Sequence, residues 1–188
     1  TVAAGPVFNF ILAALVFAGV ITWQGLATER LEVGEILQAP PGVVNQLQPG
    51  DQILAIAGHP VPDWPALFAL PETLPAAPSH DWTVRRNGAE ITVTAPDPAP
   101  PRISGVSPRS AASAADLRPG DVVLAVEGRP IARFTELRPA VEAAAGRPVA
   151  LRVWRPGVGE ADFALIPREQ DLPTADGGFE KRWLIGVT

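Results

Sequence analysis

Few residues of this chain could carry out chemistry. Hydrolysis by zinc needs clustered ligands, typically the two histidines of a His-Glu-x-x-His motif plus a carboxylate. The only histidines are His59 and His80, and neither has a partner at ligand spacing. We expect His59 in a solvated loop and His80 at the half-exposed start of a strand. No serine, cysteine or histidine arrangement suggests a nucleophile, so the sequence predicts no catalytic and no metal-binding residue in this stretch.

The acidic residues Asp51 and Asp121 belong to a repeated element instead. Residues 47–61 read LQPGDQILAIAGHPV and residues 117–131 read LRPGDVVLAVEGRPI, with eight identical positions seventy residues apart. In each copy Pro-Gly-Asp is a tight turn in which glycine supplies a positive φ, and a buried strand follows. The aspartates are therefore interpreted as turn residues, and the repeat predicts two copies of one small domain.

Composition excludes several classes of function. The chain has 188 residues, a net charge of −5 and basic residues that are scattered along it, which argues against nucleic-acid binding. Cysteine is absent, so neither a disulfide nor a thiolate metal site can form. Methionine is absent too, and we therefore expect the sequence to be a segment of a longer protein. Its length is sufficient for two domains and one further element.

Residues 1–28 contain no charged side chain. About 20 mostly apolar residues are enough for a helix to span a bilayer, and Trp23 lies where an interfacial aromatic residue would. We therefore predict a transmembrane helix over 1–28, in contact with lipid. Pro6 suits the first turn of such a helix. Asn9 marks either a functional site or a helix contact, or it lies near the interface and is hydrated.

The sequence at the start of this helix resembles a motif of a known protein family. Ala4-Gly5-Pro6 followed by Asn9-Phe10 is similar to the second transmembrane segment of the site-2 protease family of intramembrane zinc metalloproteases. The similarity is to the bacterial type that cleaves anti-sigma factors and has tandem PDZ domains. The resemblance covers essentially the whole chain, and it implies that Gly5, Pro6 and Asn9 lie near the active site of the intact protein. It also implies Zn²⁺ as the cofactor, with ligands outside this sequence.

The two copies of the repeat resemble bacterial PDZ domains, which are small, partly open β-barrels with two helices each and a permuted strand order. The predicted fold class is therefore one transmembrane α-helix followed by two α+β PDZ-like domains. The expected boundaries are the helix at 1–28, a first domain at 29–96, a proline-rich linker at 97–101 and a second domain at 102–188. In the first copy, a short helix ending at Leu47 should precede the turn.

PDZ domains bind an extended peptide by β-augmentation, with the peptide carboxylate on backbone N–H groups. In the second copy, the resemblance assigns the carboxylate loop and groove strand to Leu184, Ile185, Gly186 and Val187. A helix with Leu137 and Val141 on one apolar face would form the opposite wall. In the alternative reading, this strand only completes the barrel and the groove acts as a size filter. No such strand follows the hairpin of the first copy, whose groove is then incomplete or borrows an edge from residues 31–34.

The resemblance implies a protease that cleaves membrane proteins within or near a transmembrane helix, after another protease has trimmed them. The expected partners are these substrates, their freshly cleaved C-terminal tails and the lipid bilayer. The expected location is the bacterial inner membrane, with several spans in the intact protein and the PDZ domains in the periplasm. Two alternatives stay open: a membrane-anchored PDZ adaptor without activity, and part of a periplasmic serine protease with PDZ domains.

Overall fold

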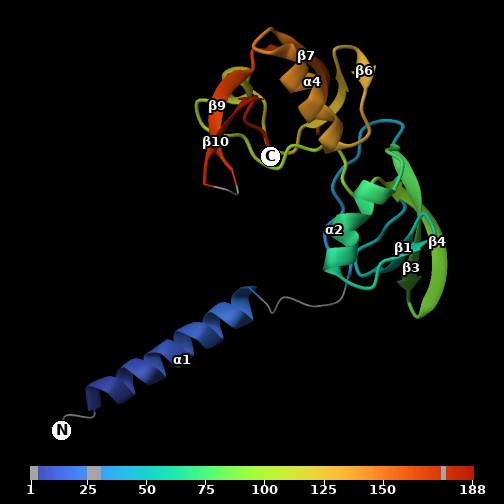
Figure 1. Ribbon diagram of the computed structural model, residues 1–188. Coiled ribbons are helices and arrows are strands. Elements are labelled where there is room, and N and C mark those ends of the chain that lie inside the picture. Colours follow the sequence, from blue (N-terminus) through green and yellow to red (C-terminus); the bar gives the residue numbers. More distant parts are fainter. Residues whose placement is uncertain (1–3, 25–30, 175–176) are drawn as a thin grey trace.

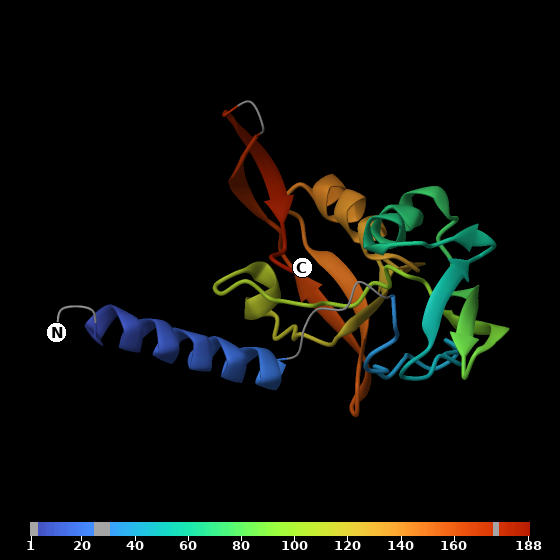
Figure 2. The ribbon, with the colours of Figure 1, turned by 90° about the horizontal axis from the view of Figure 1, so that it is seen from below.

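The computed structural model of the protein describes residues 4–24, 31–174 and 177–188, and in the first helix the side chains from Phe8 to Val20. This helix, α1 (Ala4–Gln24), stands apart from the sheets in both views (Figures 1 and 2). Its described side chains are exposed and mostly apolar. The transmembrane helix predicted over 1–28 coincides with α1 in position. Within the described part of the chain, however, no helix reaches the length and hydropathy needed to cross a membrane.

A four-stranded antiparallel sheet of order β2-β1-β3-β4 is the centre of what we call the first unit. Its elements are β1 (Gln52–Ile56), β2 (His59–Pro60), α2 (Trp64–Thr73), β3 (Ser79–Arg86) and β4 (Ala89–Pro96). Asp63 begins α2, because its carboxylate accepts a hydrogen bond from the backbone N–H of Ala66 at 2.8 Å, the usual role of an N-terminal aspartate. Apolar side chains of the sheet and α2 form one buried cluster around Ile56 and Val84.

A second four-stranded sheet, of order β6-β5-β7-β8, repeats this topology in what we call the second unit. Its elements are α3 (Ala111–Ala114), β5 (Val122–Val126), β6 (Arg129–Pro130), the 3₁₀ turn η1 (Phe134–Glu136), α4 (Leu137–Ala144), β7 (Val149–Arg155) and β8 (Gly159–Leu165). A separate buried cluster surrounds Val123, Leu151 and Ile185. This mostly β architecture fits the predicted PDZ-like fold class. A hairpin of β9 (Arg168–Pro173) and β10 (Phe179–Leu184) follows β8 (Figure 1).

The units differ in the segment before the Pro-Gly-Asp turn. In the second unit, Ser110 caps α3 by accepting a hydrogen bond from the N–H of Ser113 at 3.1 Å. At the corresponding place in the first unit, residues 40–47 form a turn and no helix. The predicted helix ending at Leu47 is therefore wrong. The sequence PPGVVNQL replaces SAASAADL there, and its two prolines, glycine and paired valines all disfavour helix.

Both Pro-Gly-Asp turns are held by an arginine from the following hairpin. Arg86 donates to Asp51 through Nε at 2.7 Å and Nη2 at 2.6 Å, and Arg155 makes the equivalent pair with Asp121, both bonds at 2.8 Å. The two aspartates are buried, and each also accepts a hydrogen bond from a backbone N–H of its own turn. The carboxylates thus join each turn to its sheet, which agrees with the turn role predicted for them.

We expect Asp51→Asn to destabilise the protein by about 2 kcal/mol at pH 7, because it removes a buried, charge-assisted pair. Hydrogen bonding from Arg86 lowers the pKa of Asp51 below its ordinary value of 3.8. The carboxylate therefore contributes its full stabilisation above the pKa of the unfolded chain, and this contribution is lost as the pH falls through the lower folded pKa. Urea unfolding should show the gap between wild type and variant closing in acid. As a control, Asp162→Asn, whose side chain is 72% exposed, should change nothing at either pH.

The two units are joined by a buried ion pair. Asp97, in the predicted linker, accepts hydrogen bonds from Arg133 of the second unit, at 2.5 Å from Nη2 and 3.1 Å from Nε. The same guanidinium donates to backbone carbonyls at the C-terminal end of α2, those of Pro71, Leu74 and Pro75. His80 contacts the other side of this carboxylate, with 3.0 Å between Nε2 and Oδ2. Its side chain is only 9% exposed, less than the half-exposed position predicted for it.

Candidate functional site

The second unit has a cavity of about 290 Å³ between α4 and the last residues of the chain. All six residues predicted to bind a peptide line it: Leu137, Val141, Leu184, Ile185, Gly186 and Val187. The remaining lining comes from Ser107, Phe134, Arg138, Gln170, Trp183 and Thr188. The structure therefore brings together, in one apolar groove, six predicted residues that are up to fifty positions apart in the sequence.

The backbone of residues 185–188 has one satisfied edge and one open edge. On one side Gly186 accepts a hydrogen bond from the N–H of Ser107 at 2.9 Å, and the N–H of Thr188 donates to Gly105 at 3.0 Å. The N–H groups of residues 185, 186 and 187 have no acceptor among the described residues. Alternate residues of an extended strand direct their N–H and C=O groups to opposite sides. The N–H and C=O of Val187 therefore point to the open side. Such unpaired donors in a row suit a carboxylate or an added strand.

Gly186 is required by this geometry. It adopts a φ of 80°, and a Cβ placed on it would come within 2.3 Å of the Ser110 Cβ. Only glycine fits both the left-handed backbone and the contact with the start of α3. The close approach also lets Ala112 donate its N–H to the carbonyl of Ile185 at 2.8 Å.

The six predicted residues do not all offer accessible surface. Leu137, Val141 and Ile185 are 3%, 4% and 4% exposed and belong to the buried cluster of the second unit. They form the floor of the cavity, whereas Leu184 and Val187 are half-buried at its mouth. Sequence reasoning therefore assigned to binding some residues whose first role is in the core.

Arg138 lines the cavity and was missed by the sequence analysis. Its side chain is 57% exposed and pairs with Glu142 at 3.0 Å. A cation at an apolar groove with open N–H donors provides a second interaction for a peptide carboxylate. Its position one residue after Leu137 on the predicted helix could have indicated that it lies beside the groove.

The residues of the helix motif lie elsewhere. Gly5, Pro6 and Asn9 belong to the first turns of α1, which is separate from the cavity beside α4 (Figure 1). Asn9 is exposed. The structure therefore does not bring these three residues together with the predicted peptide-binding residues.

The described residues do not fit a zinc site. No three of their His, Asp or Glu side chains are grouped so that they could hold a metal ion. His59 is exposed on β2, and His80 is already paired with Asp97, which also binds Arg133. A zinc ligand must have a free lone pair directed at the ion, which the Nε2 atom of His80 does not offer while it contacts Asp97.

Comparison with known proteins agrees with the predicted resemblance. Residues 102–155 match the PDZ domain family. The chain is 28% identical over 202 residues to the regulator of sigma-E protease RseP of Escherichia coli, covering 90% of this chain and 43% of that protein. A putative zinc metalloprotease of Vibrio cholerae is 24% identical over 197 residues, covering 91% of this chain and 43% of the relative.

Another relative matches a shorter part of the chain at a higher sequence identity. The metalloprotease MmpA of Caulobacter vibrioides is 34% identical over 95 residues, covering 49% of this chain and 23% of the relative. The chain spans less than half the length of each of these curated relatives. The names agree with one another and with the matched domain. Together the relatives and the matched domain support the resemblance of this chain to an RseP-like site-2 protease with a PDZ domain.

Proposed function

We propose that the second unit binds the C-terminal tail of a trimmed membrane-protein substrate, and that the intact protein then cleaves this substrate within the membrane. The observation behind the proposal is the groove beside α4, where open N–H groups of residues 185–187 lie next to Arg138. A peptide added to this edge would place its carboxylate on the N–H donors. Its last apolar side chain would enter the cavity above Leu137 and Val141.

In this proposal each unit is a PDZ-like domain, with limits at 29–96 and 102–188 and the linker 97–101 between them. The helix at 1–28 would be one of several membrane spans, and the exposed apolar side chains of α1 support an apolar environment for it. The PDZ-like pair would lie in the periplasm above a bacterial inner membrane. Anti-sigma factors are the proposed substrates, and the relatives' names support a zinc metalloprotease over an adaptor or a serine protease.

Tail binding predicts a specific effect of Arg138→Ala. We expect about a three- to tenfold weaker Kd for peptides ending in a free apolar C-terminal residue, because one charge-assisted contact is lost. Binding of the amidated peptide, which has no carboxylate, should be weak and unchanged. Fluorescence anisotropy of labelled peptides, with the chain held in mild detergent, measures both.

The matched control is Arg152→Ala. Arg152 is also 57% exposed and also pairs with a carboxylate at 3.0 Å, that of Asp162, but it lies outside the groove. It should leave the Kd unchanged. If amidated and free peptides bind equally well, or if both arginine variants behave alike, tail recognition at this groove is wrong and the size-filter reading is favoured.

The protease part of the proposal needs the intact protein. Purified in detergent, it should contain zinc and cleave a model transmembrane helix, and both properties should be lost after chelation and return with added zinc. A protein that cleaves with its metal removed would contradict the proposed reaction. Peptide binding by the second unit could still be correct in that case, because the groove contains no metal ligand.

A further inference from the structure

The first unit has an open backbone edge at residues 34–37, which lie outside its strands. Backbone contacts define its counterpart in the second unit: the N–H of Val33 donates to Asp51 and that of Ile103 to Asp121, each at 2.8 Å. With this offset of seventy, residues 34–37 correspond to 104–107. In the second unit, residues 104–107 hydrogen-bond to residues 186–188. In the first unit, the backbone of residues 34–37 makes no hydrogen bond to any described residue.

The second unit shows what fits such an edge. The N–H groups of residues 104 and 107 donate to Thr188 and Gly186 at 2.6 and 2.9 Å, and the carbonyl of residue 105 accepts from Thr188 at 3.0 Å. Val106 pairs with Val187 as an isolated bridge. The equivalent groups of the first unit are the N–H of Gly34, the N–H of Leu37 and the carbonyl of Glu35. All three belong to exposed residues, so an incoming strand could reach them.

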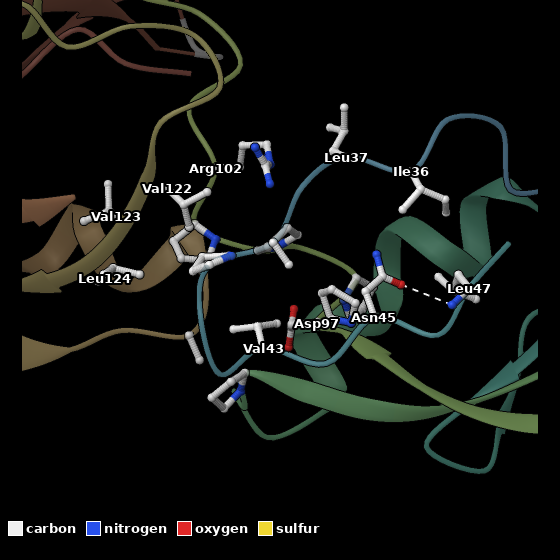
Figure 3. A pocket seen from close by; sticks show the side chains of 18 of the residues that line it. Ile36, Leu37, Val43, Asn45, Leu47, Asp97, Arg102, Val122, Val123 and Leu124 are labelled. Atoms are coloured by element: carbon white, nitrogen blue, oxygen red, sulfur yellow. Dashed lines mark hydrogen bonds between the residues drawn. The ribbon is translucent and has the colours of Figure 1, made fainter. Parts of the chain in front are cut away.

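A cavity of about 300 Å³ lies beside this edge (Figure 3). Its lining includes Ile36, Leu37 and Pro40, whose counterparts Val106, Ser107 and Ser110 contact residues 186 and 187 in the second unit. The cavity thus lies beside the edge to which the second unit pairs residues 186 and 187 of its last strand. Ile36 and Leu37 are 36% and 53% exposed, so an incoming strand could bury their apolar side chains.

Two of the three charged residues around this cavity have partners, and the third, Glu35, is exposed to solvent, where an ion pair contributes little. Asp97 is bound by Arg133 and His80, and Arg102 donates to the backbone carbonyls of Gln38 and Gly120. The rest of the lining is mainly proline, valine, leucine and isoleucine, with Val122 and Leu124 of the second unit at one end and Leu47 at the other (Figure 3). A charged ligand would gain little here, whereas an uncharged strand would satisfy the edge and bury the apolar walls.

We propose that the first unit binds an internal, uncharged peptide segment of a partner protein, with a glycine between apolar residues, as an added β-strand on residues 34–37. The segment takes the register that Ile185–Thr188 has in the second unit. This interaction needs no peptide carboxylate, so it differs from tail binding at the groove beside α4 and does not depend on it. The first unit would thus bind an internal segment of a partner chain, whereas the second unit binds a C-terminal tail.

The test uses the 188-residue chain in mild detergent and a labelled, uncharged peptide, acetyl-Trp-Leu-Ile-Gly-Val-Thr-amide, which copies residues 183–188. We expect saturable binding that is lost when the threonine nitrogen of the peptide is methylated, because that N–H would donate to Glu35. Leu37→Pro should weaken binding at least tenfold, since proline removes the backbone donor. Leu37→Ala keeps that donor and should weaken binding no more than about threefold.

Two further measurements separate this site from others. Arg138→Ala should leave the affinity for this amidated peptide unchanged, and thermal unfolding should show that the Leu37 variants stay folded. Absence of binding would overturn the proposal. So would equal binding by wild type and Leu37→Pro, which would mean that the peptide displaces the last strand of the second unit instead.

Discussion

Arg133→Met is expected to destabilise the protein by about 3–5 kcal/mol. The substitution leaves the carboxylate of Asp97, whose side chain is 1% exposed, without its cation, and breaking one side of a buried ion pair has an effect of this size. It also leaves the carbonyls at the C-terminal end of α2 without the donor that Arg133 supplies. Orphan carbonyls at a helix end otherwise need water or another cap. Chemical unfolding followed by tryptophan fluorescence measures the loss.

The matched control is Arg147→Met. Arg147 also donates to carbonyls at a helix end, those of Ala143 and Ala144 at 3.2 and 3.1 Å, but it is exposed and forms no ion pair with a described residue. We expect this variant to lose no more than about 1 kcal/mol. If the two variants were equally stable, the buried pair would contribute nothing beyond helix capping.

The same pair should couple the two units during unfolding. Wild type should unfold in one transition, and Arg133→Met should separate it into two, because the main buried contact between the units is broken. Adding Asp97→Ala to Arg133→Met should recover part of the lost stability, since no buried charge is then left alone. A double variant with strictly additive losses would contradict direct coupling.

The pair also has a pH dependence. Burial acts to raise the pKa of Asp97, but hydrogen bonds from Arg133, the N–H of Ala99 and His80 outweigh it, so the pKa lies below its ordinary value of 3.8. Its stabilisation is therefore complete above the unfolded pKa and is lost as the pH falls through the folded value. Acid should reduce the stability of wild type more than that of Asp97→Ala.

Gly186→Ala is expected to destabilise the second unit by about 3 kcal/mol and to abolish peptide binding at its groove. Alanine at a φ of 80° is strained, and its Cβ would lie 2.3 Å from the Cβ of Ser110. Because that atom is fixed to the start of α3, the last strand must move away from residues 104–107. Thermal unfolding and peptide anisotropy on the same sample measure both effects.

Two variants separate the clash from the backbone strain. Gly128→Ala also introduces alanine at a positive φ of 75°, but nothing lies within 4 Å of the new Cβ. Only the backbone strain should then destabilise this variant, by about 1–2 kcal/mol. Ser110→Gly combined with Gly186→Ala removes the clashing atom and, because glycine is a tolerable N-cap, should restore more than half of the loss. Equal effects of the two glycine variants would show that the contact with Ser110 is unimportant.

Local sequence was sufficient to predict the repeated parts. Pro-Gly-Asp followed by a short apolar run predicted β1 and β5, and Asn87-Gly88 is a hairpin turn by its own conformational preference. The same reasoning failed at residues 40–47, where similarity between the copies suggested a helix although Pro40, Pro41 and Gly42 oppose one. There the local residues, and not the repeat, determined the structure.

Contacts between distant residues could not be predicted in this way. Nothing near Arg133 in the sequence indicates that it pairs with Asp97, because an arginine after a turn is normally solvated. The burial of His80 depends on the same contact. Arg138 was missed as a groove residue for a related reason: its value for binding depends on what the last strand places opposite it.

By itself, the sequence determined the two repeated turns and strands, since these follow from local motifs. The resemblance to a known family then pointed to six of the residues that line the groove of the second unit. Only the tertiary structure decided which backbone edges are satisfied. Residues 34–37 and 104–107 are equivalent in the chain, yet only the second set pairs with a strand, because hydrogen bonds between strands depend on which distant segment folds beside them. The repeated turns are thus set by the local sequence, whereas the open edge of the first unit is a property of its fold.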